Sequence, residues 1–122
     1  MDFLTLILQV FVLLHPQLAY AQPMMPAVLL EVAQCESGQQ QFYPNGKLVS
    51  DSVTGKHIGF FQIGLQHEKE ATSMGYNIRT EEGNISYALF MYETQGLQPW
   101  LASYKDCWGK HFDMQGKPLT GT

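Results

Sequence analysis

An apolar helical stripe that ends in a carboxyl group dominates the first third of this sequence. Apolar residues recur with the i, i+3, i+4, i+7 spacing of a buried helix face at Met25, Val28, Leu29, Val32 and Ala33, and Glu36 continues the series. A carboxylic acid on such a face is partly removed from water, which favours its protonated form. An acid that is still protonated near neutral pH can donate a proton to a leaving group, so Glu36 is a candidate catalytic acid. The alternative is a glutamate that turns into solvent at the end of the helix.

The first 21 residues have the pattern of a secretory signal. Residues 3–14 are almost wholly apolar, and Ala19-Tyr20-Ala21 gives the small-x-small motif of a signal-peptidase site. The apolar run is too short to span a bilayer comfortably. We therefore expect residues 1–21 to be a signal peptide and the protein to be secreted or periplasmic. Because Met1-Asp2 lacks the usual positive charge, an uncleaved membrane anchor is the alternative.

Two cysteines, Cys35 and Cys107, indicate a disulfide in the exported chain. The chain beyond the signal has about a hundred residues, which suffices for one small domain with a modest core. The bond would stabilise that domain by roughly 4 kcal/mol on the chain-entropy estimate. It would also tie the residue next to Glu36 to the far end of the domain. Two free thiols are the alternative.

Charge and histidine placement argue against several classes of function. The formal net charge is −4, and no basic stripe indicates nucleic-acid binding. The four histidines show no metal-ligand spacing: His15, His57, His67 and His111. We therefore expect no metal and no other cofactor.

A helix and then a small β region are predicted in the first half of the domain. Pro23 and Pro26 suit a helix start, and we expect this helix to end at about Ser37. The segment that follows is polar and contains two turn signals. Short strands over residues 47–50 and 57–61 are therefore predicted to form a hairpin.

Two further helices are predicted in the second half. One covers residues 65–74, and the other covers residues 81–95, with Thr80 as its N-cap. The apolar face of the latter is expected at Ile85, Ala88, Leu89 and Tyr92. Pro99 opens a last short segment that runs through Trp108.

The predicted fold class is mainly α, of the α+β type, in one domain over residues 22–108. A small β hairpin or tongue follows the first helix, and residues 109–122 are expected to be a flexible tail. A cleft between the β region and the helices would have Glu36 at its junction.

Four short patterns follow one another along the domain. They are Glu36-Ser37-Gly38, Gly59-Phe60-Phe61-Gln62-Ile63, Glu82-Gly83-Asn84 with Ala88 and Tyr92, and Trp100-Leu101-Ala102-Ser103 followed by Cys107-Trp108. In this order they resemble the soluble lytic transglycosylase (SLT) family of the lysozyme-like superfamily, which cleaves peptidoglycan. The resemblance covers about residues 27–108, and the cysteines resemble those of small, secreted, disulfide-linked members.

The resemblance implies a lysozyme-like helical domain and a role for each matching residue. Glu36 would be the catalytic acid/base, and Ser37 would orient Glu36 or the N-acetyl group of the sugar. Tyr92 would lie behind or beside Glu36. The substrate-binding set is expected to be Ser37, Gly59, Gln62, Asn84 and Tyr92. Within it, Gln62 would hydrogen-bond substrate across the cleft, Gly59 would let the strand approach the sugar, and Asn84 would tie its helix to the loop.

The number of carboxyl groups bears on the reaction. Glycoside cleavage usually needs two carboxyl groups, whereas Glu36 is the only acid that we expect to be buried. Asp51, in a predicted turn, is the nearest second candidate. One acid suffices where the N-acetyl group of the substrate stabilises the cationic centre. In transglycosylases one glutamate protonates the bridging oxygen and then takes the proton of the C6 hydroxyl, which closes a 1,6-anhydro ring.

One departure from the family concerns a tyrosine. Many members carry a Tyr-Asn-Ala-Gly motif near the end of the domain, and its tyrosine faces the catalytic glutamate. This chain lacks that motif and has residues 100–103 followed by Tyr104 in the corresponding region. Tyr104 is a candidate replacement, and plain hydrolysis is an alternative outcome. The aromatic residues nearby, Phe60, Phe61, Trp100 and Trp108, are expected mostly in the core. Gln39, Gln40 and Gln41 either line a sugar groove or form a solvated loop.

The function expected from these patterns is cleavage of the MurNAc–GlcNAc bond of peptidoglycan by a monomeric lytic transglycosylase. Three alternatives stay open: a muramidase, a peptidoglycan-binding module that does not cut, and a component of an envelope-spanning machine.

Overall fold

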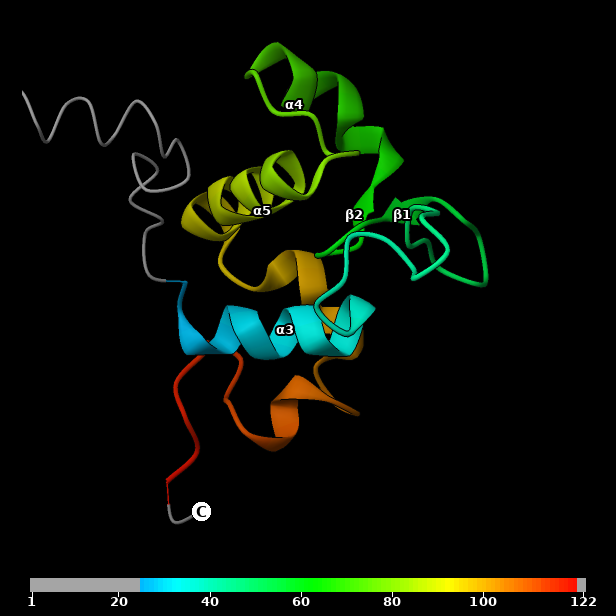
Figure 1. Cartoon of the computed structure of the whole chain (residues 1–122). Coiled ribbons are helices and arrows are strands. Elements are labelled where there is room, and N and C mark those ends of the chain that lie inside the picture. Colours follow the sequence, from blue (N-terminus) through cyan, green and yellow to red (C-terminus); the bar gives the residue numbers. More distant parts are fainter. Residues whose placement is uncertain (1–24, 121–122) are drawn as a thin grey trace, which may run out of the picture.

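The computed structural model describes residues 25–120, so the predicted signal over residues 1–21 lies outside the described part. Helix α3 (Ala27–Ser37) runs through the middle of the domain, with α5 (Glu81–Gln95) on one side and the C-terminal segment on the other (Figure 1). Of the helices in residues 25–120, none has the length and apolar character needed to cross a membrane.

Helix α3 forms where its stripe predicts it. Its buried residues are Val28, Leu29, Val32 and Ala33. The helix ends at Gly38, which has φ 69°, and the N–H groups of Gly38 and Gln39 bond the carbonyls of Gln34 and Ala33. This crossed pair of bonds closes the last turn and reverses the chain direction just after Glu36.

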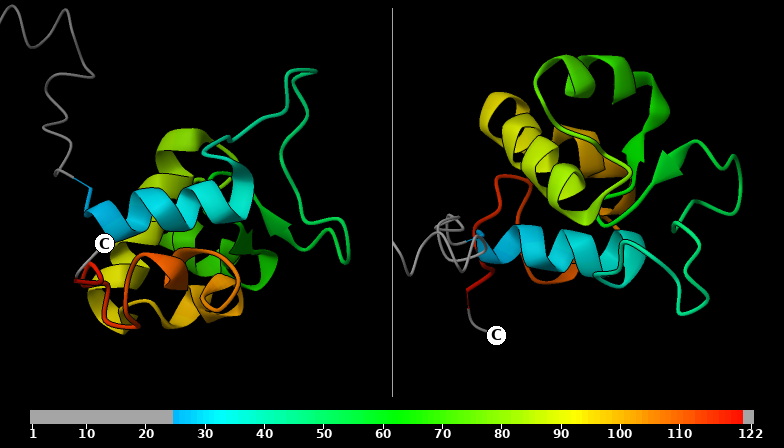
Figure 2. Two further views of the ribbon diagram at one scale, coloured as in Figure 1. Left: turned by 90° about the horizontal axis from the view of Figure 1, so that it is seen from below. Right: turned by 45° about the horizontal axis from the view of Figure 1, so that its top comes forward.

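The β region differs from its prediction. Strand β1 (His57–Ile58) pairs antiparallel with β2 (Ile63–Gly64), with Ile58 opposite Ile63. The predicted partner, residues 47–50, meets β1 only through an isolated bridge between Ser50 and Ile58. The predicted hairpin is therefore present only as this short antiparallel contact, with hydrogen bonds from the Gly59 N–H to the Val49 carbonyl and from the Asp51 N–H to the His57 carbonyl. The two-stranded sheet forms with β2 instead, because the chain turns back directly after Ile58. The loop over residues 39–56 extends away from the helices (Figure 2).

The two later helices occur near their predicted positions. A 3-10 turn, η1 (Leu65–His67), leads into α4 (Glu68–Ser73). Helix α5 begins at Thr80, whose hydroxyl accepts a hydrogen bond from the Gly83 N–H at 3.1 Å, so the predicted N-cap is confirmed. Its buried face is rotated from the predicted one, and consists of Gly83, Asn84, Tyr87, Ala88 and Met91.

The C-terminal part folds back on the domain. The 3-10 segments η2 (Gln98–Ser103) and η3 (Trp108–Lys110) pack against α3. Beyond them, Phe112 pairs with Pro118, and the Asp113 carboxylate accepts the N–H groups of Gln115 and Lys117, both at 2.9 Å. Where the sequence predicts a frayed tail, the described residues up to 120 instead form a hydrogen-bonded turn.

A disulfide joins Cys35 to Cys107, as predicted, with 6.0 Å between the Cα atoms. It connects α3 to the segment between η2 and η3. The fold is therefore a mixed α+β domain with a small two-stranded antiparallel sheet, and its core lies between α3, α5 and η2.

Candidate active site

Glu36 lies in the last turn of α3, and its side chain is half-buried. Burial raises the pKa of this carboxyl above its ordinary value, because removing the group from water penalises the charged form. A hydrogen bond with Ser103 and the nearby His57 act in the opposite direction but do not cancel the effect. Glu36 is thus biased toward its protonated form, as its place on the apolar stripe predicts.

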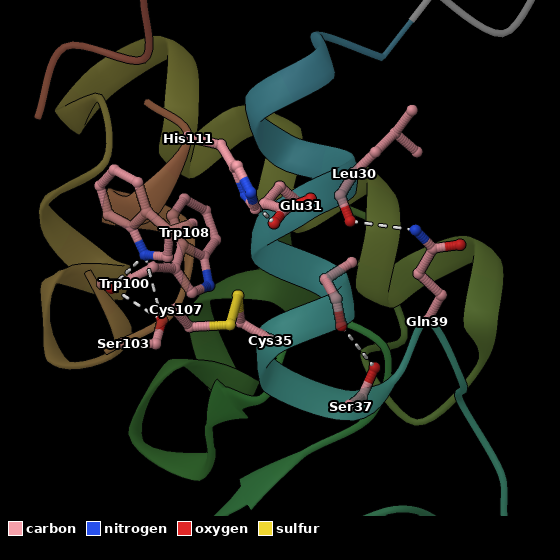
Figure 3. The surroundings of a disulfide bond; sticks show 11 residues. Leu30, Glu31, Cys35, Ser37, Gln39, Trp100, Ser103, Cys107, Trp108 and His111 are labelled. Atoms are coloured by element: carbon pink, nitrogen blue, oxygen red, sulfur yellow. Dashed lines mark hydrogen bonds and ion pairs between the residues drawn. A yellow bond between two sulfur atoms is a disulfide. The ribbon is translucent and has the colours of Figure 1, made fainter. Parts of the chain in front are cut away.

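The disulfide brings the segment around Ser103 under the end of α3. Figure 3 shows Cys35, Cys107, Ser103 and Trp108 together against this helix. The Trp108 indole is completely buried, and its N–H donates to the Ser103 hydroxyl at 3.1 Å. Ser103 belongs to one of the four sequence patterns but was given no role, because no local pattern relates it to a carboxyl group 67 positions away.

Ser37 links α3 to the turn between β1 and β2. Its hydroxyl donates to the Phe60 carbonyl at 2.7 Å, lies 3.2 Å from the Ala33 carbonyl, and accepts the Gln40 N–H at 3.1 Å. These backbone contacts occupy the hydroxyl. Ser37 instead fixes the position of the turn relative to Glu36.

Gly59 and Asn84 build the inner side of that turn. Gly59 has φ 79°, and a Cβ atom there would lie 2.4 Å from the Asn84 amide nitrogen and 2.5 Å from the Gln41 amide oxygen. The close approach that requires glycine is therefore to these buried amides, whereas the resemblance implied an approach to the sugar. Sequence reasoning placed Gln41 in a groove or a solvated loop, but it is 2% exposed.

Asn84 ties α5 to the turn, as the resemblance implied. Its amide accepts the Phe61 N–H at 2.9 Å and donates to the carbonyls of Ile58 at 3.0 Å and Ile78 at 2.9 Å. The side chain is fully buried, so all of these bonds are inside the protein. Asn84 consequently has no free amide group to offer to a substrate.

Gln62 lines a pocket next to this turn. The pocket has a volume of about 170 Å³, and its polar lining includes His57, Gln62, Gln66, His67 and Gln95. Gln62 itself has φ 50°, a left-handed conformation that costs a non-glycine residue about 1 kcal/mol. Its amide nitrogen donates to the Gly59 carbonyl at 3.1 Å, which helps to hold that conformation. His57, a second lining residue, is also the charge that acts on Glu36.

The two tyrosines considered for the site have other surroundings. Tyr92 is half-buried on α5 against the core, and within residues 25–120 its hydroxyl makes no hydrogen bond. The Tyr104 ring packs edge-on against Trp108 at a centroid distance of 4.8 Å. In the described part of the chain, neither tyrosine hydrogen-bonds Glu36.

Asp51 is fully engaged in its own turn. Its carboxylate accepts the N–H of Thr54 at 2.7 Å and that of His57 at 2.9 Å, and it lies 3.2 Å from the His57 ring nitrogen. Hydrogen bonds from Thr54 and His57 hold the pKa of Asp51 well below its usual range. Asp51 therefore favours its ionised form and orients His57.

The aromatic residues near the site are mainly core residues, as expected. Phe61, Trp100 and Trp108 are buried, and Phe60 is half-buried. The Trp100 indole N–H donates to the Phe61 carbonyl at 3.0 Å, which links η2 to the β1–β2 turn. In the described part of the chain, no cluster of three or more histidine, cysteine or acidic side chains is arranged to hold a metal ion.

Comparisons with models of protein families, with curated protein sequences and with solved structures found no match to this chain.

Proposed function

We propose that this protein is a lytic transglycosylase that cleaves the MurNAc–GlcNAc bond of peptidoglycan, with Glu36 as its single acid/base. The proposal includes the lysozyme-like fold that the sequence patterns imply, export through the signal over residues 1–21, and action at the cell wall as a monomer or within an envelope-spanning assembly. The observation that carries it is the half-buried Glu36 carboxyl at the end of α3, with its raised pKa and its position near His57 of the polar pocket.

The raised pKa of Glu36 suits both steps of such a reaction. In the first step the protonated carboxyl gives its proton to the bridging oxygen, and the C1–O bond breaks. In the second step the Glu36 carboxylate takes the proton of the C6 hydroxyl, whose oxygen bonds to C1 and closes the 1,6-anhydro ring. A group that acts first as acid and then as base works best with a pKa close to the ambient pH.

The surroundings of Asp51 favour a one-carboxyl mechanism. A second carboxylate would normally stabilise the cationic C1 centre or attack it. Asp51 is committed to the Thr54 and His57 bonds of its turn, so it would have to break them to take that role. The N-acetyl group of the substrate itself then stabilises C1, which is an established exception for N-acetylated sugars.

The pocket beside His57 is the proposed place for part of the glycan. Its lining combines amide side chains with the apolar surfaces of Ile63, Met91 and Trp100, a mixture that matches the polar edges and apolar faces of a sugar. Ser37, Gly59 and Asn84 act on substrate only through the shape of the adjoining turn.

The test compares the purified protein with Glu36→Gln. Glutamine has nearly the same size but carries no acidic proton, so we expect muropeptide release from isolated peptidoglycan to fall by about three orders of magnitude or more. Mass spectrometry of the released sugars identifies the reaction, because an anhydro product is lighter by one water than a hydrolysed one. Glu93→Gln, at an exposed position of α5, serves as the matched control and should retain the activity. Equal activity in wild type and Glu36→Gln would remove Glu36 from the mechanism.

A second function is favoured by the tyrosines. A tyrosine facing the catalytic glutamate is typical of the family, whereas Tyr104 packs on Trp108 and Tyr92, which lies against the core, makes no hydrogen bond with Glu36. The chain would then be a module that binds peptidoglycan without cutting it. Sedimentation with peptidoglycan in the absence of any released muropeptide, from pH 4 to pH 8, would support this second function over the first.

A further inference from the structure

One wall of the pocket is built on the cross-strand pair of His57 on β1 and Gly64 on β2. Residues directly opposite each other in an antiparallel pair direct their side chains to the same face of the sheet. Gly64 has an extended backbone with φ −64°, so its conformation does not require glycine. A Cβ atom at Gly64 would instead overlap the side-chain amide of Gln66. The missing side chain therefore makes room for the Gln66 amide on the face of the sheet that carries His57.

Asp51 determines which ring nitrogen of His57 is available to a ligand. One oxygen of its carboxylate accepts the His57 backbone N–H at 2.9 Å and lies 3.2 Å from Nδ1 of the same residue. The Thr54 N–H and hydroxyl also bond the carboxylate, and the pKa of Asp51 is held well below its usual range. Because an ionised carboxylate only accepts hydrogen bonds, Nδ1 carries the hydrogen. In the neutral ring Nε2 is then an acceptor, and within residues 25–120 it has no hydrogen-bond partner.

The pocket also contains amide groups that have no partner in the protein. In the described part of the chain, the side-chain amides of Gln66 and Gln95 make no hydrogen bond. The same pocket is lined by the buried side chains of Ile63, Met91 and Trp100. Among the described residues, no aspartate, glutamate, lysine or arginine lines it. The pocket thus offers an acceptor, amide donors and apolar surface, which together suit an uncharged polar group.

We propose that His57, held by Asp51, is a specificity-determining residue whose Nε2 accepts a hydrogen bond from the N–H of an acetamido group of the glycan. This inference rests on the proposed function, which brings an N-acetylated saccharide to the site. The amides of Gln66 and Gln95 donate to the acetamido carbonyl, and the apolar side chains contact its methyl group. This acetamido group belongs to a different sugar from the one at which the bond breaks, because the latter sugar needs its own group at C1.

Recognition by Nε2 depends on the protonation of His57. An acetamido N–H can only donate, so it requires the neutral ring, in which Nε2 is an acceptor. In the protonated ring Nε2 also carries a hydrogen, and two donors face each other. A sugar hydroxyl can donate or accept, so a saccharide with a hydroxyl in place of the acetamido group tolerates both forms of the ring. The pocket therefore selects N-acetylated sugar only while His57 is uncharged.

Three other titratable groups have to be separated from His57. Asp51 holds the ring from the preceding loop, and His67 of η1 lines the same pocket. Glu36, at the end of α3, feels the charge of His57. The residues that α5 and η2 contribute to the lining are uncharged. Variants at His67 and Glu36 therefore complete the test.

The experiment measures the binding of tri-N-acetylchitotriose, a soluble, uncharged trimer of N-acetylglucosamine, by calorimetry from about pH 8 to about pH 5. In the same samples, proton–nitrogen NMR spectra of the imidazole show which ring nitrogen carries hydrogen and when the ring becomes charged. We expect the Kd to rise about tenfold or more as His57 is protonated, the equivalent of one lost hydrogen bond. Cellotriose, which has a hydroxyl in place of each acetamido group, should bind without this pH dependence. Glu36→Gln should behave like wild type in both measurements.

Two variants of His57 test the acceptor itself. His57→Gln keeps an acceptor oxygen that does not titrate, so it should bind the trimer at about pH 8 nearly as well as wild type and retain this affinity at about pH 5. His57→Phe keeps the size of the side chain without a ring nitrogen. It should bind at every pH as weakly as the protonated wild type.

Three further variants control for location. Gly64→Ala displaces the Gln66 amide without backbone strain, so it should weaken binding at every pH and leave the pH dependence in place. His67→Gln should also retain the pH dependence. His111→Gln removes a histidine that is paired with Glu31 on the C-terminal segment, and should bind like wild type throughout.

The two proposals fail in different ways. If the Kd does not change while the NMR spectra show that His57 becomes charged, or if His57→Phe binds the trimer like wild type, the role of His57 is wrong whatever the activity. Loss of the pH dependence in His67→Gln, or no binding of the trimer at any pH, would also overturn it. If binding behaves as expected but wild type releases no muropeptide, the lytic activity is wrong while recognition by His57 is supported.

Discussion

At the scale of single residues, Gly59 meets two demands that no other residue type satisfies. It has φ 79°, and a Cβ atom would overlap the amides of Asn84 and Gln41. The left-handed conformation costs a non-glycine residue about 1 kcal/mol, and overpacking of a filled interior costs about 1–3 kcal/mol more. We therefore expect Gly59→Ala to lower the free energy of unfolding by about 2–4 kcal/mol, measured by urea unfolding.

Gly55 offers a matched control for this prediction. It has φ 69°, and no atom lies within 4 Å of the position its Cβ would occupy. Gly55→Ala should therefore cost only the backbone part, about 1 kcal/mol. If the two variants lose the same stability, the close approach of the buried amides to Gly59 contributes nothing.

Residue-scale predictions succeeded where the signal is local. The stripe places Glu36 on the buried side of its helix, and Thr80 precedes a helix whose first N–H groups need an acceptor. By contrast, Gln41 is one of three consecutive glutamines. It lies inside the protein because its amide accepts the Phe60 N–H at 2.8 Å and donates to the Ile78 carbonyl at 3.2 Å. Both partners are distant in sequence, so no local pattern marks which glutamine is the interior one.

At the scale of elements, the disulfide is the main constraint on how α3 meets the segment after η2. Its cysteines are separated by 72 positions, so removing the bond frees a long loop in the unfolded chain. We expect Cys35→Ala with Cys107→Ala to lower the free energy of unfolding by roughly 4 kcal/mol on the chain-entropy estimate. Urea unfolding of the double variant, beside oxidised and reduced wild type, measures this loss. Reduced wild type should match the variant, and a loss below about 1 kcal/mol would contradict the estimate.

Pairing between elements was the part of the fold that sequence reasoning predicted least well. The strands at residues 47–50 and 57–61 were chosen by composition, and composition does not identify a strand's partner. Here Gly59 and Gln62 adopt positive φ values and return the chain onto β1 at Ile63. The buried face of α5 was misjudged for a related reason. It was predicted from apolar residues alone, whereas the polar Asn84 lies inside because its amide satisfies three backbone groups.

At the scale of the whole molecule, the C-terminal segment packs against the domain, whereas its sequence predicts a flexible tail. Its glycine, lysine and threonine content suggests a tail, but Gly116 lies against Val28 and Leu97 so closely that a Cβ atom would be only 3.0 Å from the Val28 side chain. Helix α3 is therefore covered on the side opposite α5 as well. A polar, glycine-containing segment can cover a core where its backbone groups bond one another, and composition alone does not reveal this.

Also at this scale, the stability of the protein depends on pH through carboxyl groups whose pKa values are shifted in opposite directions by folding. Hydrogen bonds lower the pKa of Asp51 and of Glu68, which is paired with Arg79, so the stability that these groups contribute is lost as the pH falls. Burial raises the pKa of Glu36 above its ordinary value of 4.5. Its contribution is therefore fully present below that ordinary value and is lost as the pH rises through the raised one.

The opposite sign at Glu36 gives a prediction for Glu36→Gln that is independent of activity. Glutamine never ionises, so the variant avoids the penalty of a half-buried charge. We expect its free energy of unfolding, relative to wild type, to increase as the pH rises from about 4 to about 8. Urea unfolding across this range measures the difference. Glu93→Gln, at an exposed position of α5, is the control, because its side chain stays in contact with water and the substitution removes no buried charge. A constant difference for Glu36→Gln would mean that burial does not penalise the ionised Glu36, and the basis for its role as an acid would be lost.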